Sequence, residues 1–248
     1  MFKGKSLIAF DMDGTLIDSM GIWNEVDRLL IKELGGDYNI PEEEIQEQRD
    51  SNLKKFNLSE NPYTEYSKVL KAKYNSDYSP EDINDMRFSI AQDFIINVTD
   101  YKPDAENFIK KLKENGFIIG IASNTSSRIM EKYKTKNQNI IQKANLDDHF
   151  DFIYTKDDVQ KTKPNPEIYY KIFDEYHVAA NDCLVIEDAL VGVETANNAG
   201  IDCVALYDKY ADKEREQINK IAKYQVNNFN ELIEILESEF NDGENGLC

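Results

Sequence analysis

Five short apolar runs, separated by longer stretches of helical character, constrain the fold of this chain more than any other feature. Each run is continuously apolar, as expected for strands of a parallel sheet that is buried on both faces. The runs fall at 6–10, 117–122, 151–154, 183–187 and 203–206, and Tyr224–Val226 is a candidate for a last edge strand. The helical stretches fall at about 104–115, 126–136, 166–176, 189–199, 212–222 and 229–239. This alternation predicts right-handed crossovers and a doubly wound, three-layer α/β domain.

The segment from about residue 18 to residue 97 interrupts the alternation, because it shows helical patterns but no convincing strand. Prolines stand at the expected starts of three of its helices. The expected helices are 20–34, 41–57, 62–74 and 80–97. We therefore expect an all-helical domain at 18–97, inserted into a core formed by 1–17 and 98–248. This insert is acidic, since residues 17–100 carry 18 acidic and 9 basic side chains.

Two carboxylates end the first apolar run, in the sequence Asp11-Met12-Asp13-Gly14-Thr15. Open α/β sheets bind their ligands outside the carboxyl ends of the strands, which is where Asp11 and Asp13 are expected. Like charges this close are unfavourable unless a cation or a shared proton relieves them. By itself the run would also suit an ordinary strand followed by a polar turn.

Three later segments also carry polar residues next to the expected sheet. Ser123 and Asn124 follow the run at 117–122, and Glu187 and Asp188 end the run at 183–187. Between them lies a loop, residues 161–167, whose two lysines precede prolines that open a helix. Taken singly, the first two segments also suit helix capping. A strand-to-helix junction such as the one after residue 122 can donate backbone amides to a phosphate.

With these four elements in this order, the chain resembles the haloacid dehalogenase-like (HAD) hydrolases, and among them the β-phosphoglucomutase and phosphoglycolate phosphatase-like members. The resemblance covers nearly the whole chain. It implies a Rossmann-like core, with the helical insert as a cap that closes over the substrate. It also implies phosphoryl transfer through a phospho-aspartate and a requirement for Mg²⁺.

The resemblance assigns a role to each motif residue. It makes Asp11 the nucleophile and a magnesium ligand, and Asp13 the general acid/base, with the Asp13 backbone carbonyl as a further metal ligand. It makes Asp188 the second carboxylate ligand of the metal. Glu187 would accept a hydrogen bond from a metal-bound water.

The resemblance also predicts the phosphate-binding residues. Ser123 and the Asn124 backbone amide would donate to the phosphate. A lysine immediately before Pro-x-Pro is the family pattern, which selects Lys163 over the competing Lys161 as the cation that neutralises the phosphate. In the cap, Arg49 is the nearest candidate for a substrate contact.

Charge and composition limit the partners. The formal net charge of −18 argues against nucleic acid and anionic membranes as partners. The small phosphorylated metabolite that the resemblance implies as substrate would gain no steering from this charge, so local groups would have to bind it. No apolar stretch approaches the roughly 18 residues that span a bilayer. The N-terminal apolar run stops at Asp11 and is too short for a signal peptide. We therefore expect a cytoplasmic protein, as a monomer or weak dimer.

The leading hypothesis is a magnesium-dependent phosphomonoester hydrolase for a small phosphorylated metabolite. A β-phosphoglucomutase-type phosphomutase shares the same core, and a non-catalytic phosphate-binding regulatory domain could keep the same fold. Related mutases carry a glycine-containing arginine motif in the cap. Arg49 stands instead between Gln48 and Asp50, which favours the hydrolase.

Overall fold

A computed structural model of the chain describes residues 1–56, 59 and 61–241. It divides into two compact units, one formed by Met1–Ser19 with the chain from Thr99 onward, the other by Met20–Val98. Residue 57 of the expected helix at 41–57 and residues 242–248 of the expected core lie outside the described residues. Among those described, no helix has both the length and the apolar character needed to span a bilayer.

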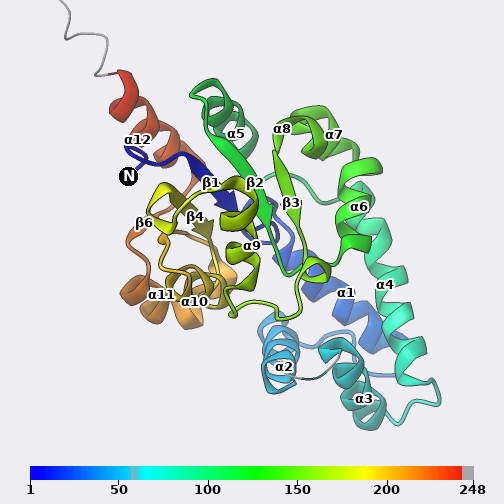
Figure 1. The fold of residues 1–248 in the computed structure, drawn as a ribbon. Helices are drawn as coiled ribbons and strands as arrows, with labels where there is room; N and C mark the ends of the chain where they lie inside the picture. The colour runs from blue at the N-terminus through cyan, green and yellow to red at the C-terminus, as the bar shows by residue number, and fades with distance from the viewer. Residues whose placement is uncertain (57–58, 60, 242–248) are drawn as a thin grey trace, which may run out of the picture. The chain divides into compact units, whose positions relative to one another are not determined.

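A six-stranded parallel sheet forms the centre of the first unit (Figure 1), in the order β3-β2-β1-β4-β5-β6. The strands are β1 (Leu7–Phe10), β2 (Ile118–Ala122), β3 (Phe152–Tyr154), β4 (Cys183–Glu187), β5 (Asp202–Leu206) and β6 (Tyr224–Val226). Nearly all residues of the four central strands are buried, which explains their continuous apolar sequence. The α/β class and the parallel sheet are confirmed.

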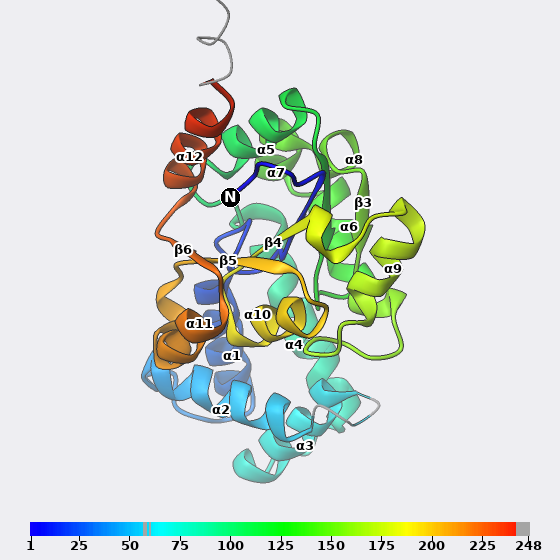
Figure 2. The same ribbon diagram turned by 60° about the vertical axis from the view of Figure 1, so that its left-hand side comes forward.

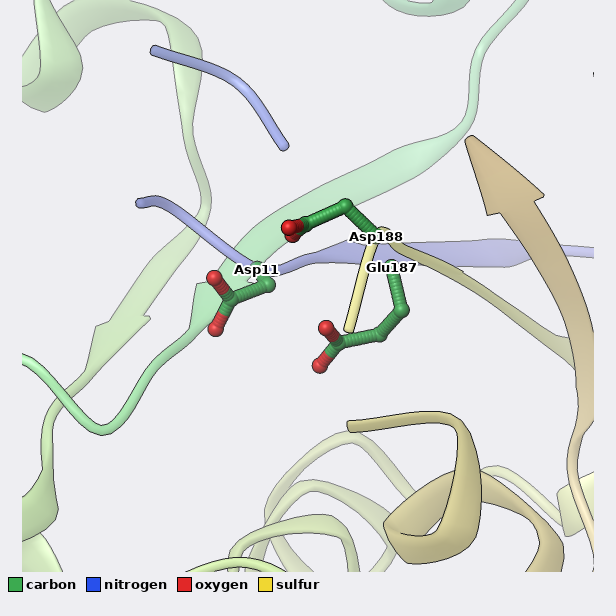
Figure 3. A group of neighbouring side chains, drawn as sticks. All are labelled: Asp11, Glu187 and Asp188. Atoms are coloured by element: carbon green, nitrogen blue, oxygen red, sulfur yellow. The ribbon is translucent and has the colours of Figure 1, made fainter. Parts of the chain in front are cut away.

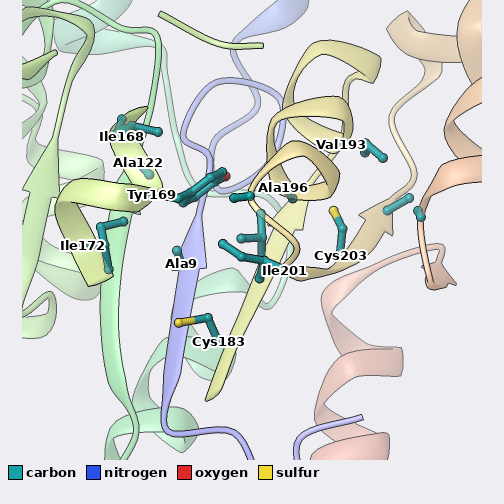
Figure 4. Packing of buried hydrophobic residues seen from close by; sticks show 14 of the residues in the cluster. Ala9, Ala122, Ile168, Tyr169, Ile172, Cys183, Val193, Ala196, Ile201 and Cys203 are labelled. Atoms are coloured by element: carbon teal, nitrogen blue, oxygen red, sulfur yellow. The ribbon is translucent and has the colours of Figure 1, made fainter. Parts of the chain in front are cut away.

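Helices cover both faces of this sheet (Figure 2). On one face, Ala9 of β1 belongs to a buried cluster with Tyr169 and Val193 from two helices (Figure 4). Leu7 of β1 belongs to the same cluster. On the other face, the Phe10 ring packs edge-on against Phe108 and Phe150. The helices of this unit are α5 (Ala105–Glu114), α6 (Ser127–Thr135), α7 (Gln138–Ala144), α8 (Leu146–His149), α9 (Glu167–Tyr176), α10 (Leu190–Asn198), α11 (Arg215–Ile221) and α12 (Phe229–Asn241).

Two of these helices, α7 and α8, were not predicted from the sequence. Both are short, so neither shows a sustained apolar period. Their starts are fixed by side chains: Asn137 Oδ1 accepts from the Ile140 amide at 3.0 Å, and Asn145 Oδ1 accepts from the Asp147 amide at 2.9 Å. The first part of the expected helix at 212–222 is a 3₁₀ turn, Lys209–Glu214.

Four helices form the second unit: α1 (Met20–Glu33), α2 (Glu42–Lys55), α3 (Pro62–Tyr74) and α4 (Pro80–Asn97). Pro62 and Pro80 are the first residues of their helices, as predicted. Ser79 caps α4, since its hydroxyl accepts from the Asp82 amide at 3.0 Å. The core of this unit includes Leu30, Leu34, Tyr66, Leu70 and Ile83. Its function as a cap stays a prediction.

Candidate active site

The turn after β1 brings its first carboxylate to the end of β4. Phe10 of β1 is paired with Ile186 of β4, and the Asp11 amide continues this ladder by donating to the Ile186 carbonyl at 3.0 Å. Gly14 has a φ of +89°, and a Cβ added there would lie 2.4 Å from Asp188 Oδ2. Only glycine therefore allows both the left-handed turn and the close approach of Asp188.

Three carboxylates meet at this edge of the sheet. One carboxylate oxygen from each of Asp11, Glu187 and Asp188 lies within 4.8 Å of the other two. Figure 3 shows the three side chains together. Glu187 and Asp188 are buried, and Thr15 Oγ1 donates to Asp188 Oδ1 at 2.6 Å. Burial and the neighbouring Asp11 raise the pKa of Asp188 to about 7. Neutralisation of this concentrated negative charge requires a cation or a proton.

Lys163 supplies part of that positive charge. Its Nζ donates to Asp11 Oδ1 at 2.8 Å and also to Glu187 Oε1. Burial alone would lower the pKa of Lys163, but the carboxylates of Asp11 and Glu187 hold it well above its usual value. Lys161 is exposed, and its backbone amide donates to Glu167 Oε2. The ion pairs at this cluster therefore belong to Lys163 and not to Lys161.

The cluster fits a divalent cation. Three carboxylates against one ammonium leave an excess of negative charge, and the donor set consists of oxygens, which hard cations such as Mg²⁺ prefer. Asp11, Glu187 and Asp188 each offer one such oxygen. Glu187 also forms a buried ion pair with Lys163, so it orients the lysine in addition to its expected role towards a metal-bound water. The metal role of the Asp13 carbonyl stays a prediction.

The expected phosphate-binding residues lie at the adjacent end of β2. The Ser123 amide donates to the Tyr154 carbonyl at 2.9 Å, and the Ser123 hydroxyl donates to Thr125 Oγ1 at 3.2 Å. Asn124 is exposed, and its Oδ1 accepts from the Lys163 amide at 3.1 Å. This hydrogen bond holds the lysine loop against the end of β2. Phosphate binding by Ser123 and Asn124 stays a prediction.

Three hydroxyl groups surround the carboxylate of Asp13. Ser19 Oγ donates to Asp13 Oδ1 at 2.7 Å, and Tyr133 OH lies 3.4 Å from the same oxygen. Thr125 Oγ1 donates to Asp13 Oδ2. Burial and the nearby Asp13 raise the pKa of Tyr133 well above its usual value, so the phenol remains a neutral donor.

These three hydroxyl residues were missed by the sequence reasoning. Thr125 directly follows Ser123 and Asn124, and this position in a polar run was the one sequence signal that could have marked it as a site residue. Tyr133 lies on the buried side of α6 and reads as an ordinary apolar helix position. Its contact with Asp13 spans 120 residues of sequence, which no local pattern can reveal.

Arg49, the predicted cap contact, is buried within the helical unit. Its Nη1 donates to Asp27 Oδ2 at 3.0 Å and its Nε to Asp50 Oδ1 at 3.1 Å. Asp27 also accepts from Arg87 Nε at 2.6 Å. Arg49 therefore ties α2 to α1, while its Nη2 has no hydrogen-bond partner among the described residues. A contact of Arg49 with substrate stays a prediction.

The family model of haloacid dehalogenase-like hydrolases matches residues 8–206. This range contains the acidic turn, the lysine loop and the residues at the ends of β2 and β4. The chain belongs to this family.

A curated relative, the phosphoglycolate phosphatase of Aquifex aeolicus, is 25% identical over 194 residues, which are 78% of this chain and 81% of that protein. Four other curated relatives are matched over only 16% to 55% of their own length.

Two solved structures show the same fold. The HAD-hydrolase YfnB of Bacillus subtilis, solved with bound magnesium, has a TM-score of 0.73 and 17% identity, over 94% of this chain and 99% of that one. CbbY of Rhodobacter sphaeroides, solved in complex with phosphate, has a TM-score of 0.70 and 22% identity, over 92% and 96%.

Proposed function

We propose that this protein is a magnesium-dependent phosphomonoester hydrolase that acts on a small phosphorylated metabolite through a phosphorylated Asp11. The observation that carries the proposal is the buried group of Asp11, Lys163, Glu187 and Asp188 at the carboxyl edge of the sheet. It combines a nucleophile, a fixed cation and oxygen ligands for a metal. The relative from Aquifex aeolicus, named for phosphoglycolate, supports a small phosphorylated substrate.

In the first half-reaction, an Asp11 carboxylate oxygen attacks phosphorus, and the bond from phosphorus to the leaving oxygen breaks in line. Lys163, the Ser123 hydroxyl and the Asn124 amide offset charge on the phosphoryl oxygens. Asp13 gives its proton to the leaving alkoxide. In the second half-reaction, Asp13 takes a proton from water, which hydrolyses the acyl phosphate and restores Asp11.

Asp11, Asp188 and the Asp13 carbonyl would hold the Mg²⁺, with Glu187 as an outer acceptor. When bound, the ion neutralises charge on the phosphoryl group and on the acidic cluster. The hydroxyl of Thr15 donates to Asp188 Oδ1 and would restrict the orientation of this ligand.

The test is release of inorganic phosphate from p-nitrophenyl phosphate, and then from a panel of sugar phosphates, nucleotides and phospho-acids, with and without Mg²⁺. We expect magnesium-dependent release that Asp11→Asn abolishes. Release in excess chelator, or more than a few per cent of activity in Asp11→Asn, would contradict the mechanism. No release from any compound would favour the non-catalytic alternative.

A phosphomutase would use the same phosphorylated Asp11, so the fate of the phosphoryl group separates the two enzymes. We expect water to be the acceptor, because the arginine nearest to the family's cap motif is already paired with Asp27 and Asp50. β-Glucose 1-phosphate with a trace of glucose 1,6-bisphosphate should therefore yield free phosphate. Glucose 6-phosphate as the main product would establish the mutase instead.

A further inference from the structure

The carboxylate of Asp13 is held from three separate segments of the α/β unit. Ser19 follows the acidic turn, Thr125 follows β2, and Tyr133 lies in the last turn of α6. Ser19 and Tyr133 bond Oδ1, and Thr125 bonds Oδ2. With hydroxyl contacts at both oxygens, rotation of the carboxyl group about its bond to Cβ breaks at least one of them.

The hydroxyls come from well-packed positions. Ser19 is 1% exposed, Thr125 9% and Tyr133 0%. A phenylalanine at position 133 would fill the same apolar space, so packing alone does not require the phenol oxygen. A buried hydroxyl without a hydrogen-bond partner costs free energy. Asp13 is one of the partners of the Tyr133 hydroxyl.

Thr125 also connects Asp13 to the phosphate-binding segment. Ser123 Oγ donates to Thr125 Oγ1 at 3.2 Å, and the Thr125 amide donates back to Ser123 Oγ at 3.2 Å. Together with the bond from Thr125 to Asp13, this makes a continuous chain of hydroxyls from Ser123 to the carboxylate. When the single Ser123 hydroxyl proton is donated to a phosphate instead, the bond from the Thr125 amide to Ser123 Oγ can persist. Thr125 therefore still joins the group predicted to bind phosphate to the group predicted to move the proton.

We propose that Thr125 and Tyr133 are positioning residues that hold the Asp13 carboxyl group in the orientation required for proton transfer to the leaving group. This inference rests on the proposed function, since it takes Asp13 as the general acid/base. Neither residue supplies or accepts the transferred proton. Loss of the Thr125 hydroxyl removes its contact with Oδ2, whereas loss of the Tyr133 hydroxyl loosens Oδ1, which Ser19 still contacts. Either change leaves the nucleophile, lysine and metal ligands intact.

The test compares two aryl phosphates whose leaving groups differ in their need for a proton. p-Nitrophenolate leaves without much help, whereas phenolate requires protonation. In Thr125→Val, we expect kcat/KM for phenyl phosphate to fall about 10-fold or more, up to the ~10²–10⁴-fold reach of general acid catalysis. In Tyr133→Phe we expect a smaller fall for the same ester, because Ser19 still contacts Asp13 Oδ1. For p-nitrophenyl phosphate we expect a fall of less than about three-fold. Thr125→Ser keeps the hydroxyl and should recover most of the rate for phenyl phosphate.

A matched control is Tyr101→Phe, which removes a buried hydroxyl that donates to the Ala144 carbonyl at 2.6 Å. It should affect both esters equally. Equal losses for both esters in Thr125→Val and Tyr133→Phe, or no loss, would overturn the positioning role while leaving the hydrolase intact. A wild-type protein that releases no phosphate would overturn the proposed function and this inference together. If Tyr133→Phe does not fold, as judged by circular dichroism, the Thr125→Val and Thr125→Ser pair decides the question.

Discussion

Lys163 is the residue on which the electrostatics of the site depend. Its side chain is 2% exposed and touches two carboxylates, of which Glu187 is equally buried. A buried charge without its partner is far more costly than the pair, because neither water nor a counter-ion replaces the lost contact. The same ammonium that would neutralise a phosphate therefore also stabilises the fold.

We predict that Lys163→Met lowers the free energy of unfolding by about 3–5 kcal/mol, since it leaves Asp11 and Glu187 without their cation. Phosphatase activity should be lost as well. Urea denaturation and phosphate release measure the two effects. Lys161→Met is the control, because that side chain is exposed, and it should change neither quantity. A larger loss in Lys161→Met would show that the wrong lysine was chosen.

Asp188 gives the metal-free protein a pH dependence of stability. Its pKa is raised to about 7 in the folded state, whereas an unfolded aspartate titrates near ~3.9. The folded state thus binds this proton more tightly, so the contribution of Asp188 to the free energy of unfolding falls as pH rises from about 4 through about 7. Above that range the charged carboxylate destabilises the fold unless a cation is bound.

It follows that Mg²⁺ should raise the melting temperature more at about pH 8 than at about pH 5, where protons compete with the metal. This difference is measured by thermal unfolding at the two pH values, with chelator and with excess Mg²⁺. Asp188→Asn should reduce both the loss of stability at high pH and the effect of the metal. An equal effect of Mg²⁺ at the two pH values would contradict the assignment of Asp188 as a ligand.

At the scale of elements, the positions of the central strands, and of the polar residues at their ends, can be predicted from the sequence. The central strands are continuous apolar runs, and their polar ends are adjacent in sequence to them, so Asp11, Glu187 and Asp188 could be assigned to one edge of the sheet. Lys163 was identified by the prolines that follow it. The hydroxyls of Ser19, Thr125 and Tyr133 contact Asp13 only through tertiary packing, so no local sequence pattern predicts these contacts. The helices α7 and α8 are short and begin at asparagine caps, so they show no periodic apolar pattern.

The turn after β1 offers a test at this scale. Gly14 and Gly4 both have φ above +80°, but a Cβ at Gly4 would meet nothing within 4 Å, whereas at Gly14 it would meet Asp188. Gly4→Ala should cost only the ~1–2 kcal/mol of a left-handed alanine. Gly14→Ala should cost more and should raise the Mg²⁺ concentration needed for half-maximal phosphate release. Unchanged magnesium dependence in Gly14→Ala would mean that the turn does not fix Asp188.

At the scale of the whole molecule, the formal net charge of −18 opposes the approach of an anionic substrate. The charge of the proposed site would differ, because three carboxylates, one ammonium and a bound divalent cation would sum to zero. Such a neutral cluster would not repel a phosphate that has reached it, whereas the long-range field of the chain would oppose its approach. The repulsion is screened over a Debye length of about 10 Å at ~0.1 M salt.

We predict that kcat/KM for phenyl phosphate rises roughly two-fold as ionic strength increases from ~0.01 M to ~0.15 M at saturating Mg²⁺, because screening removes the long-range repulsion. The value of kcat should change little, since the bound substrate already lies within the neutralised cluster. Initial rates over a series of sodium chloride concentrations separate the two constants, and a magnesium titration at each salt concentration verifies that the metal site stays filled. A fall in kcat/KM with salt would indicate that a local positive field, stronger than the net charge of the chain, guides the substrate to Asp11.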